Sequence, residues 1–153
     1  MRHRPIGILV DALRELGAQI EYAEETGFPP LRITGQELKG GSLSLSGSVS
    51  SQYISALLMI APMMEQGLTL TLTGDIVSRP YIDMTLTIMA TFGAKAQWRD
   101  ERTLRVEPEK YKPTPYTIEN DWSASSYWYE MVALQQDPET KITPKRTFSY
   151  TNL

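Results

Sequence analysis

The sequence repeats itself at a distance of about 75 residues, and this repeat constrains the fold more than any other feature. Residues 4–18 resemble residues 79–94, and residues 47–53 resemble residues 120–127 at nearly the same offset. The first pair has the pattern of a helix ending at a glycine, and the second has the pattern of a loop opening a helix. We therefore expect one whole structural unit, preceded by the latter half of a similar unit and followed by the start of another. A chain with this organisation is expected to be an excised piece.

The whole unit is predicted over residues 42–107, where hydrophobic periodicity gives the order of the elements. Strict alternation of apolar and polar residues is typical of strands, and apolar residues three or four apart are typical of helices. The expected elements are two strand and helix pairs followed by a hairpin: Ser42–Ser46, Ser50–Met64, Leu68–Thr73, Pro80–Phe92, Ala96–Trp98 and Thr103–Val106. Their helices are expected to bury Ile54, Leu57, Leu58, Ala61, Ile82, Leu86 and Met89. The predicted fold class is α+β, with repeated βαβαββ units.

Partial units are predicted on both sides, over residues 1–41 and 108–153. The first is expected to hold a helix with Ile6, Leu9, Val10 and Leu13 on one face, and the second is expected to begin with a proline-rich linker. The expected elements are Pro5–Leu16, Gln19–Tyr22, Leu31–Thr34, Tyr116–Ile118 and Trp122–Leu134, the first and last being helices and the others strands.

Composition excludes several classes of function. The 153 residues carry 15 basic and 18 acidic side chains, with no basic block that would follow a nucleic-acid backbone. No apolar run approaches the roughly 20 residues of a membrane-spanning helix, so we expect a soluble protein. The absence of Cys removes disulfides and thiolate sites and is compatible with a cytoplasmic protein. The lone His3 is expected to be solvated.

The segment Gly47–Gln52 joins a predicted strand to the start of a predicted helix. Unpaired N–H groups and the positive end of the helix dipole favour an anion at such a place, and neighbouring serine hydroxyls would suit phosphate. The alternative is that Ser48 or Ser50 merely caps the helix, since Ser is a preferred capping residue.

A second polar helix start, Asp75–Tyr81, follows the next strand. If the two strands are neighbours, Ser78 and Arg79 could converge on the same anion, with Arg79 supplying a charge-assisted hydrogen bond. The alternative is again a capping serine, beside a solvated arginine.

Other residues are weaker candidates for chemistry. The sequence slightly favours packing of the Tyr81 ring on the core, and Asp11 and Asp83 are expected to compensate helix dipoles. An aromatic cluster on the last helix is expected to be core or interface: Trp122, Tyr127, Trp128 and Tyr129. No nucleotide loop, catalytic triad, carboxylate pair or metal-ligand cluster stands out.

Several long segments resemble the 5-enolpyruvylshikimate 3-phosphate synthase family, in the family's own order. They are Arg4 to Ala18, Pro29-Pro30-Leu31, Gly47 to Met59, Gly74 to Asp83 and Phe92-Gly93-Ala94. The resemblance covers residues 1 to about 134. It implies a fold of two domains, each with three βαβαββ units, and transfer of the enolpyruvyl group of phosphoenolpyruvate to the 5-hydroxyl of shikimate 3-phosphate, without a metal or organic cofactor.

The resemblance also implies roles for particular residues. Ser50, Ser51 and Ser78 would hold the shikimate phosphate, Gln52 would reach the reacting region near both substrates, and Tyr81 would lie against the shikimate. Arg79 is a secondary candidate. All of these are binding roles, and no catalytic residue is assigned to this chain.

The family's catalytic groups have no counterpart here. Its Lys-Ser segment, an Arg before the counterpart of Met1, and the Asp and Lys-Glu pairs of its later half are missing. We therefore expect a fragment of about a third of the enzyme, which cannot turn over alone because the site forms when two domains close. The tail from about Pro144 to Leu153 also departs from the family's pattern.

Two other readings stay open at this point. A UDP-N-acetylglucosamine enolpyruvyl transferase has the same architecture, although its substrate would not call for the two serine segments. A non-catalytic anion-binding module is the alternative from another class. For the enzyme fragment, the expected partners are the remainder of the same enzyme and, because half units expose strand edges, other copies of the chain.

Overall fold

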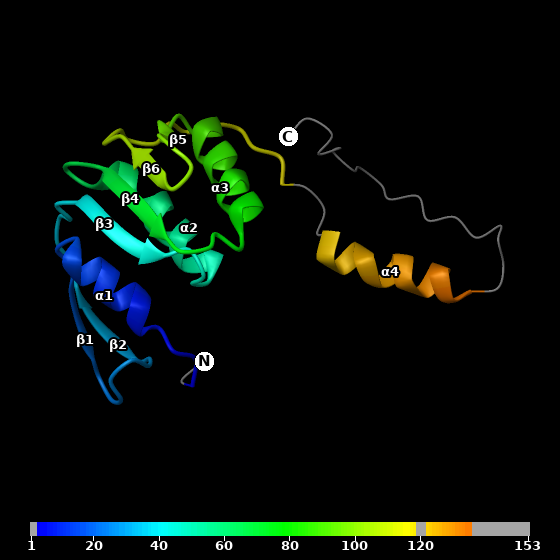
Figure 1. The fold of residues 1–153 in the computed structure, drawn as a ribbon, viewed down its shortest axis with the longest axis horizontal. Coiled ribbons are helices and arrows are strands. Elements are labelled where there is room, and N and C mark those ends of the chain that lie inside the picture. The colour runs from blue at the N-terminus through cyan, green and yellow to red at the C-terminus, as the bar shows by residue number, and fades with distance from the viewer. Residues whose placement is uncertain (1–2, 119–121, 136–153) are drawn as a thin grey trace. The chain divides into compact units, whose positions relative to one another are not determined.

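The computed structural model describes residues 3–118 and 122–135 (Figure 1). The chain divides into two compact units, Met1–Thr114 and Pro115–Leu153. The elements of the first unit are, in chain order, α1 (Gly7–Glu15), β1 (Gln19–Tyr22), β2 (Leu31–Thr34), β3 (Gly41–Ser46), α2 (Ser51–Ile60), η1 (Ala61–Met63), β4 (Leu68–Thr73), α3 (Arg79–Thr91), β5 (Ala96–Trp98) and β6 (Thr103–Val106). The predicted order of strand, helix, strand, helix and hairpin is confirmed from β3 to β6.

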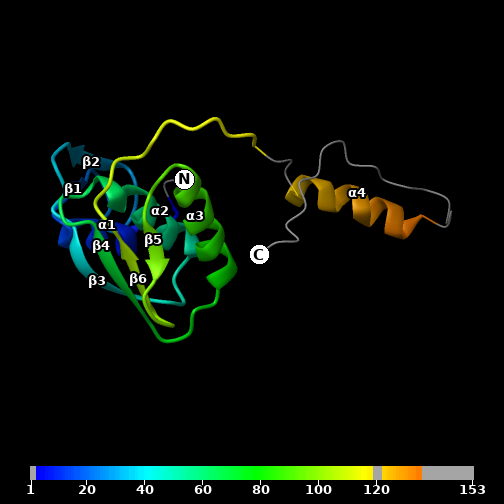
Figure 2. The ribbon, with the colours of Figure 1, turned by 90° about the horizontal axis from the view of Figure 1, so that it is seen from above.

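A four-stranded sheet in the order β3-β4-β6-β5 forms the centre of the first unit (Figure 2). β3 and β4 are parallel, and β6 pairs antiparallel with both β4 and β5. Alternation places Leu43, Leu70 and Leu104 on one face, where all three are buried. Ser44 and Thr71 point to the opposite face and are exposed or half-buried. One face of the sheet is therefore apolar and the other is lined by small polar side chains.

The apolar face is covered by helices. All the positions predicted to be buried in α2, η1 and α3 are buried. Ala12 of α1 and Leu16, which follows that helix, belong to the same core. The hydroxyl groups of Ser55 and Thr85 form a hydrogen bond of 2.7 Å, so α2 and α3 are linked by a hydrogen bond as well as by packing.

The repeat predicted from the sequence has a structural counterpart, because α1 and α3 are each followed by an antiparallel hairpin (Figure 1). Both helices end in the same way. The N–H of Ala18 donates to the carbonyl of Leu13 at 2.9 Å, and the N–H of Ala94 donates to that of Met89 at 3.0 Å. The residue before each donor is a glycine with positive φ, which is the glycine-terminated helix end known as a Schellman motif. The unit boundaries at residues 41 and 107 stay a prediction.

Two predicted elements differ from the structure by more than two residues at one end or in kind. The helix expected over Ser50–Met64 ends at Ile60 and continues as η1, because Pro62 has no N–H to donate to the preceding turn. Tyr116–Ile118 was expected to be a strand but has no regular structure. A strand needs a hydrogen-bonded neighbour, and no described strand pairs with this segment.

In the second unit, α4 (Trp122–Leu134) has the predicted bounds. Its aromatic cluster was expected to be core or interface. Tyr127, Trp128 and Tyr129 are exposed and so are not core residues, and an interface stays a prediction. The side chain of Trp122 and the tail from Pro144 to Leu153 lie outside what the structure describes. Among the described residues, no helix has the length and apolar character needed to cross a membrane.

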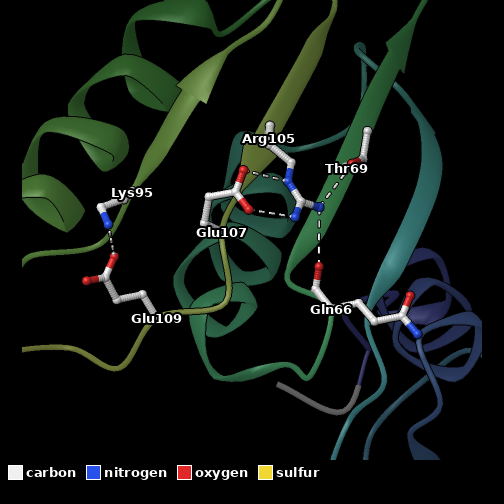
Figure 3. Close-up of polar contacts among 6 residues, drawn as sticks. All are labelled: Gln66, Thr69, Lys95, Arg105, Glu107 and Glu109. Carbon is white, nitrogen blue, oxygen red and sulfur yellow. Dashed lines mark hydrogen bonds and ion pairs between the residues drawn. The ribbon is translucent and has the colours of Figure 1, made fainter.

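Polar contacts bind the segment after β6 to the sheet (Figure 3). Arg105 donates two hydrogen bonds to the Glu107 carboxylate, at 3.0 and 2.7 Å, and a third to the carbonyl oxygen of Gln66 at 3.2 Å. Lys95 pairs with Glu109 at 3.0 Å. Beyond them the chain passes the ends of the helices, where the N–H of Glu109 donates to the carbonyl of Pro62 and the N–H of Lys112 donates to that of Phe92.

Candidate functional site

Two polar loops leave the sheet side by side. β3 and β4 are parallel, and their last residues, Ser46 and Thr73, are partners in the register. The loop that leads to α2 and the loop that leads to α3 therefore begin at the same edge of the sheet. The sequence suggested a shared anion site only if these two strands were neighbours, and they are.

The loops also contact each other directly. The N–H of Gly47 donates to the carbonyl of Thr73 at 2.7 Å, and the N–H of Val77 donates to the carbonyl of Gly47 at 3.4 Å. A Cβ built on Gly47 would lie 2.7 Å from the carbonyl oxygen of Asp75, well inside van der Waals contact. Glycine is therefore required at this position by the close approach of the neighbouring loop.

Each loop ends at a serine that occupies the N-cap position of a helix. These residues are Ser50, before α2, and Ser78, before α3, and neither hydroxyl makes a capping hydrogen bond. The hydroxyl of Ser48 instead contacts that of Ser46 at 2.7 Å. The hypothesis that Ser50 and Ser78 merely cap the helices is therefore not supported. We call the edge of the sheet where the two loops begin the loop edge. The N-terminal N–H groups of both helices lie at this edge, with hydroxyl groups beside them.

The remaining predicted site residues lie on the first turns of the two helices. Ser51 and Gln52 are the first two residues of α2, the former half-buried and the latter exposed. Tyr81, on the first turn of α3, is 60% exposed, so the expectation that its ring packs on the core is wrong. Tyr53 donates its hydroxyl to the carbonyl of Pro5 at 2.5 Å, which ties α2 to the segment before α1.

Arg79 is not a solvated arginine. Its guanidinium carbon lies 4.2 Å from the centroid of the Trp98 ring, and one of its nitrogens donates to the carbonyl of Glu101 at 3.1 Å. Trp98 in turn donates its Nε1–H to the carboxylate of Asp83 at 2.7 Å. Asp83 thus has a specific partner, where the sequence suggested only compensation of the helix dipole. Residue spacing could not reveal this cluster, because α3 and β5 meet only in the folded chain.

The β5–β6 turn is organised by Asp100. Its carboxylate accepts hydrogen bonds from the N–H groups of Arg102 and Thr103, both at 2.8 Å. The bond from the Arg102 amide is the main reason that the pKa of Asp100 lies below its ordinary value. Arg102 extends from this turn to donate to the carbonyl of Gly74, at the start of the loop before α3. The turn therefore supports that loop.

Of two cavities in the first unit, one lies beside these loops and the other does not. One of about 430 Å³ lies beside the loop that leads to α3, and its lining includes Gly74, Arg79 and Arg102. Another of about 690 Å³ is lined by the region of η1 and by residues 108–110, and none of the predicted site residues borders it. Arg79 thus borders the first cavity, whereas Ser50, Ser51 and Ser78 line neither of the two.

A family model described as EPSP synthase (3-phosphoshikimate 1-carboxyvinyltransferase) matches residues 1–147 of the chain. The chain belongs to the EPSP synthase family. The match agrees with the first of the two enolpyruvyl transferases that the sequence left open.

Relatives with the name 3-phosphoshikimate 1-carboxyvinyltransferase agree with the family. The one from Bacteroides fragilis is 55% identical over 150 residues, which are 98% of this chain and 37% of that protein. The one from Aliivibrio fischeri is 43% identical over 145 residues, which are 94% of this chain and 34% of that protein. The chain therefore spans about a third of the length of these relatives.

Solved structures agree with the EPSP synthase fold. An EPSP synthase from Acinetobacter baumannii superimposes with a TM-score of 0.64 at 26% identity, over 83% of this chain and 27% of that one. The enolpyruvyl transferase NikO from Streptomyces tendae has a TM-score of 0.60 at 17% identity, over 84% of this chain and 31% of that one, which shows likeness of fold alone. The fold is thus α+β, of the enolpyruvyl transferase type.

Proposed function

We propose that this chain is the shikimate 3-phosphate-binding part of an enzyme that transfers the enolpyruvyl group of phosphoenolpyruvate to the 5-hydroxyl of shikimate 3-phosphate, with release of phosphate. The observation that carries the proposal is the contact between the two serine loops at the ends of β3 and β4. Membership of the EPSP synthase family supplies the identity of the ligand.

The chemistry of the loop edge suits a phosphate group. Ser50, Ser51 and Ser78 offer hydroxyl donors, and they stand at the N-termini of α2 and α3, where backbone N–H groups and the helix dipoles attract negative charge. Hydrogen bonds to an ionised acceptor are the strong ones, so a few such donors suffice for specific binding.

The two other site residues are proposed to recognise the rest of the substrates. Gln52 would reach the reacting region near both shikimate 3-phosphate and phosphoenolpyruvate, and Tyr81 would lie against the shikimate ring. Both side chains are exposed at the loop edge and so are accessible to a ligand. Their contribution is alignment of the acceptor hydroxyl with the enolpyruvyl carbon.

Proton transfer is assigned to groups that this chain does not contribute. We propose that the chain alone does not turn over and that its partner is the remainder of the same enzyme, without a metal or organic cofactor. The check is an assay of phosphate release from shikimate 3-phosphate and phosphoenolpyruvate. Release that grows with the concentration of purified chain would contradict the proposal.

Two further expectations belong to this proposal. A cytoplasmic location is compatible with the cysteine-free sequence. Self-association is proposed because apolar side chains are exposed on α1, β2 and η1, among them Ile8, Ile33 and Met63. Sedimentation as a monomer at high concentration would count against self-association.

The experiment that tests binding is an NMR titration of the chain with shikimate 3-phosphate and, separately, with unphosphorylated shikimate. We expect saturable shifts with the phosphorylated ligand, and their loss in the Ser50→Ala, Ser51→Ala double variant. A matched control is Ser44→Ala, on the polar face of β3 away from the loop edge. Equal responses to the two ligands in the folded wild-type chain would refute a phosphate site.

A further inference from the structure

Trp98 is held by two successive turns of α3. The guanidinium of Arg79, the first residue of the helix, stacks over the ring, and the carboxylate of Asp83, one turn later, accepts the indole N–H. All three side chains are half-buried, so their interactions are partly shielded from water. The start of α3 is therefore attached to β5 through Trp98.

The loop before α3 is attached to the same hairpin at both of its ends. At its start, Arg102 donates to the carbonyl of Gly74, and at its end Arg79 donates to the carbonyl of Glu101. Ser78 lies between these two attachments, one residue before Arg79. The two attachments therefore restrain the backbone of Ser78 relative to the hairpin.

We propose that Arg79, Asp83 and Trp98 are positioning residues, which fix Ser78 and the N-terminus of α3 for binding of the shikimate phosphate. In this proposal Arg79 acts through α3 and does not itself contact the phosphate. The sequence had instead suggested Arg79 as a secondary ligand of the anion. The expected effect on phosphate binding rests on the proposed function. The positioning of the start of α3 does not depend on it.

The two roles of Arg79 predict different responses to substitution. A phosphate ligand that acts through its charge alone would tolerate Arg79→Lys, because the positive charge remains, and would be insensitive to a change at Trp98. A positioning residue needs the planar guanidinium for stacking, so Arg79→Lys and Trp98→Leu would have similar effects, and their effects would not add.

The first test follows amide hydrogen exchange in the full chain, without ligand. The informative amides are those of Tyr81 and Ile82, which donate to the Ser78 carbonyl, and that of Val77, which donates to Gly47. In Trp98→Leu we expect these amides to exchange about tenfold faster, with amides of the β4 core unchanged. Arg99→Met, which removes an exposed charge from the same hairpin, serves as the control.

Either of two results would overturn the positioning role. Exchange in Trp98→Leu that matches the Arg99→Met control would show that Trp98 does not hold the helix start. Equal acceleration in α3 and in β4 would show that Trp98 only stabilises the fold as a whole. Because no ligand is involved, this test decides the positioning role even if the chain binds no phosphate.

The second test measures the ratio of affinities for shikimate 3-phosphate and for unphosphorylated shikimate. We expect the ratio to fall by about three- to tenfold in Trp98→Leu and in Arg79→Lys, and to recover in Trp98→Phe, which keeps an aromatic face for Arg79. A ratio that stays unchanged in both Trp98→Leu and Arg79→Lys would overturn the role of these residues in positioning the phosphate site. Absence of phosphate-dependent binding in the wild-type chain would refute the proposed function alone.

Discussion

The backbone N–H of Gly47 donates a 2.7 Å hydrogen bond to the carbonyl of Thr73, across the ends of two parallel strands. This bond starts the contact between the two loops that carry Ser50 and Ser78. Space for the contact exists only because residue 47 has no side chain, since a Cβ there would lie 2.7 Å from the Asp75 carbonyl oxygen and 3.0 Å from Ile76.

Gly47→Ala should therefore separate the loops. Because the nearest obstacle is backbone and cannot rotate away, we expect a loss of unfolding free energy of about 1–3 kcal/mol together with weaker binding of shikimate 3-phosphate. Urea unfolding and ligand titration would measure the two effects. Gly35→Ala is the control, because a Cβ at Gly35 would meet nothing within 4 Å. Equal stability of the two variants would contradict this account of the loop contact.

The glycines that end α1 and α3 should be equivalent. Gly17 has a φ of 104° and Gly93 a φ of 85°, a backbone region that disfavours side chains. Alanine at either position should lower the unfolding free energy by about 1–2 kcal/mol. Thermal and urea unfolding of the two single variants would test this. A clear loss at one position and none at the other would argue that the two repeats are not structural equivalents.

Leu70 lies at the centre of the buried face of the sheet and is fully buried, with 0% of its surface exposed. Leu70→Ala should reduce the unfolding free energy by about 2–5 kcal/mol, through loss of apolar burial and creation of a cavity. Ile33→Ala on β2, where the side chain is 64% exposed, should change it far less. Similar losses at both sites, measured by urea unfolding, would contradict the assignment of the core.

The ion pair between Arg105 and Glu107 should make stability depend on pH (Figure 3). The hydrogen bonds from Arg105 lower the pKa of Glu107 below its ordinary value of 4.5. A carboxyl group with a lowered folded pKa stabilises the fold above its unfolded pKa, and this stabilisation is lost as pH falls through the folded value. Glu107→Gln should therefore be less stable than wild type at neutral pH, with the difference shrinking as pH falls below 4.5.

Urea unfolding at several pH values would measure this difference. Glu65→Gln, which changes an exposed carboxylate after η1, is the matched control and should show no comparable trend. The account of the pair is wrong if the stability difference between Glu107→Gln and wild type stays constant or grows on acidification.

Most elements of the first unit could be predicted because their periodicity is strict. Alternation in Leu68–Thr73 gave the bounds of β4, and a glycine in the repeat marked the end of each of α1 and α3. The end of α2 was placed too late because its apolar pattern continues past Pro62. The strand expected over residues 116–118 failed for another reason, since strand formation depends on a neighbour that a local pattern cannot supply.

The loop edge could be predicted in part. The sequence identified the segments with Ser50 and Ser78, whereas their adjacency was only a condition that the structure meets. The partners of the arginine after Ser78 were not foreseen. The contacts of Arg79 and Asp83 with Trp98 join residues 15 or more positions apart on two elements, and no spacing rule connects them. The exposure of Tyr81 was also missed, because a tyrosine in the first turn of a helix suits burial and solvent equally well.

The central claim is that the two serine loops form one phosphate site. The most direct measurement follows the amide signals of residues 47–53 and 74–81 in a single NMR titration with shikimate 3-phosphate. We predict that signals from both loops shift with one common midpoint, and that Ser78→Ala weakens the response of both. Shifts confined to one loop, or two clearly different midpoints, would contradict a shared site.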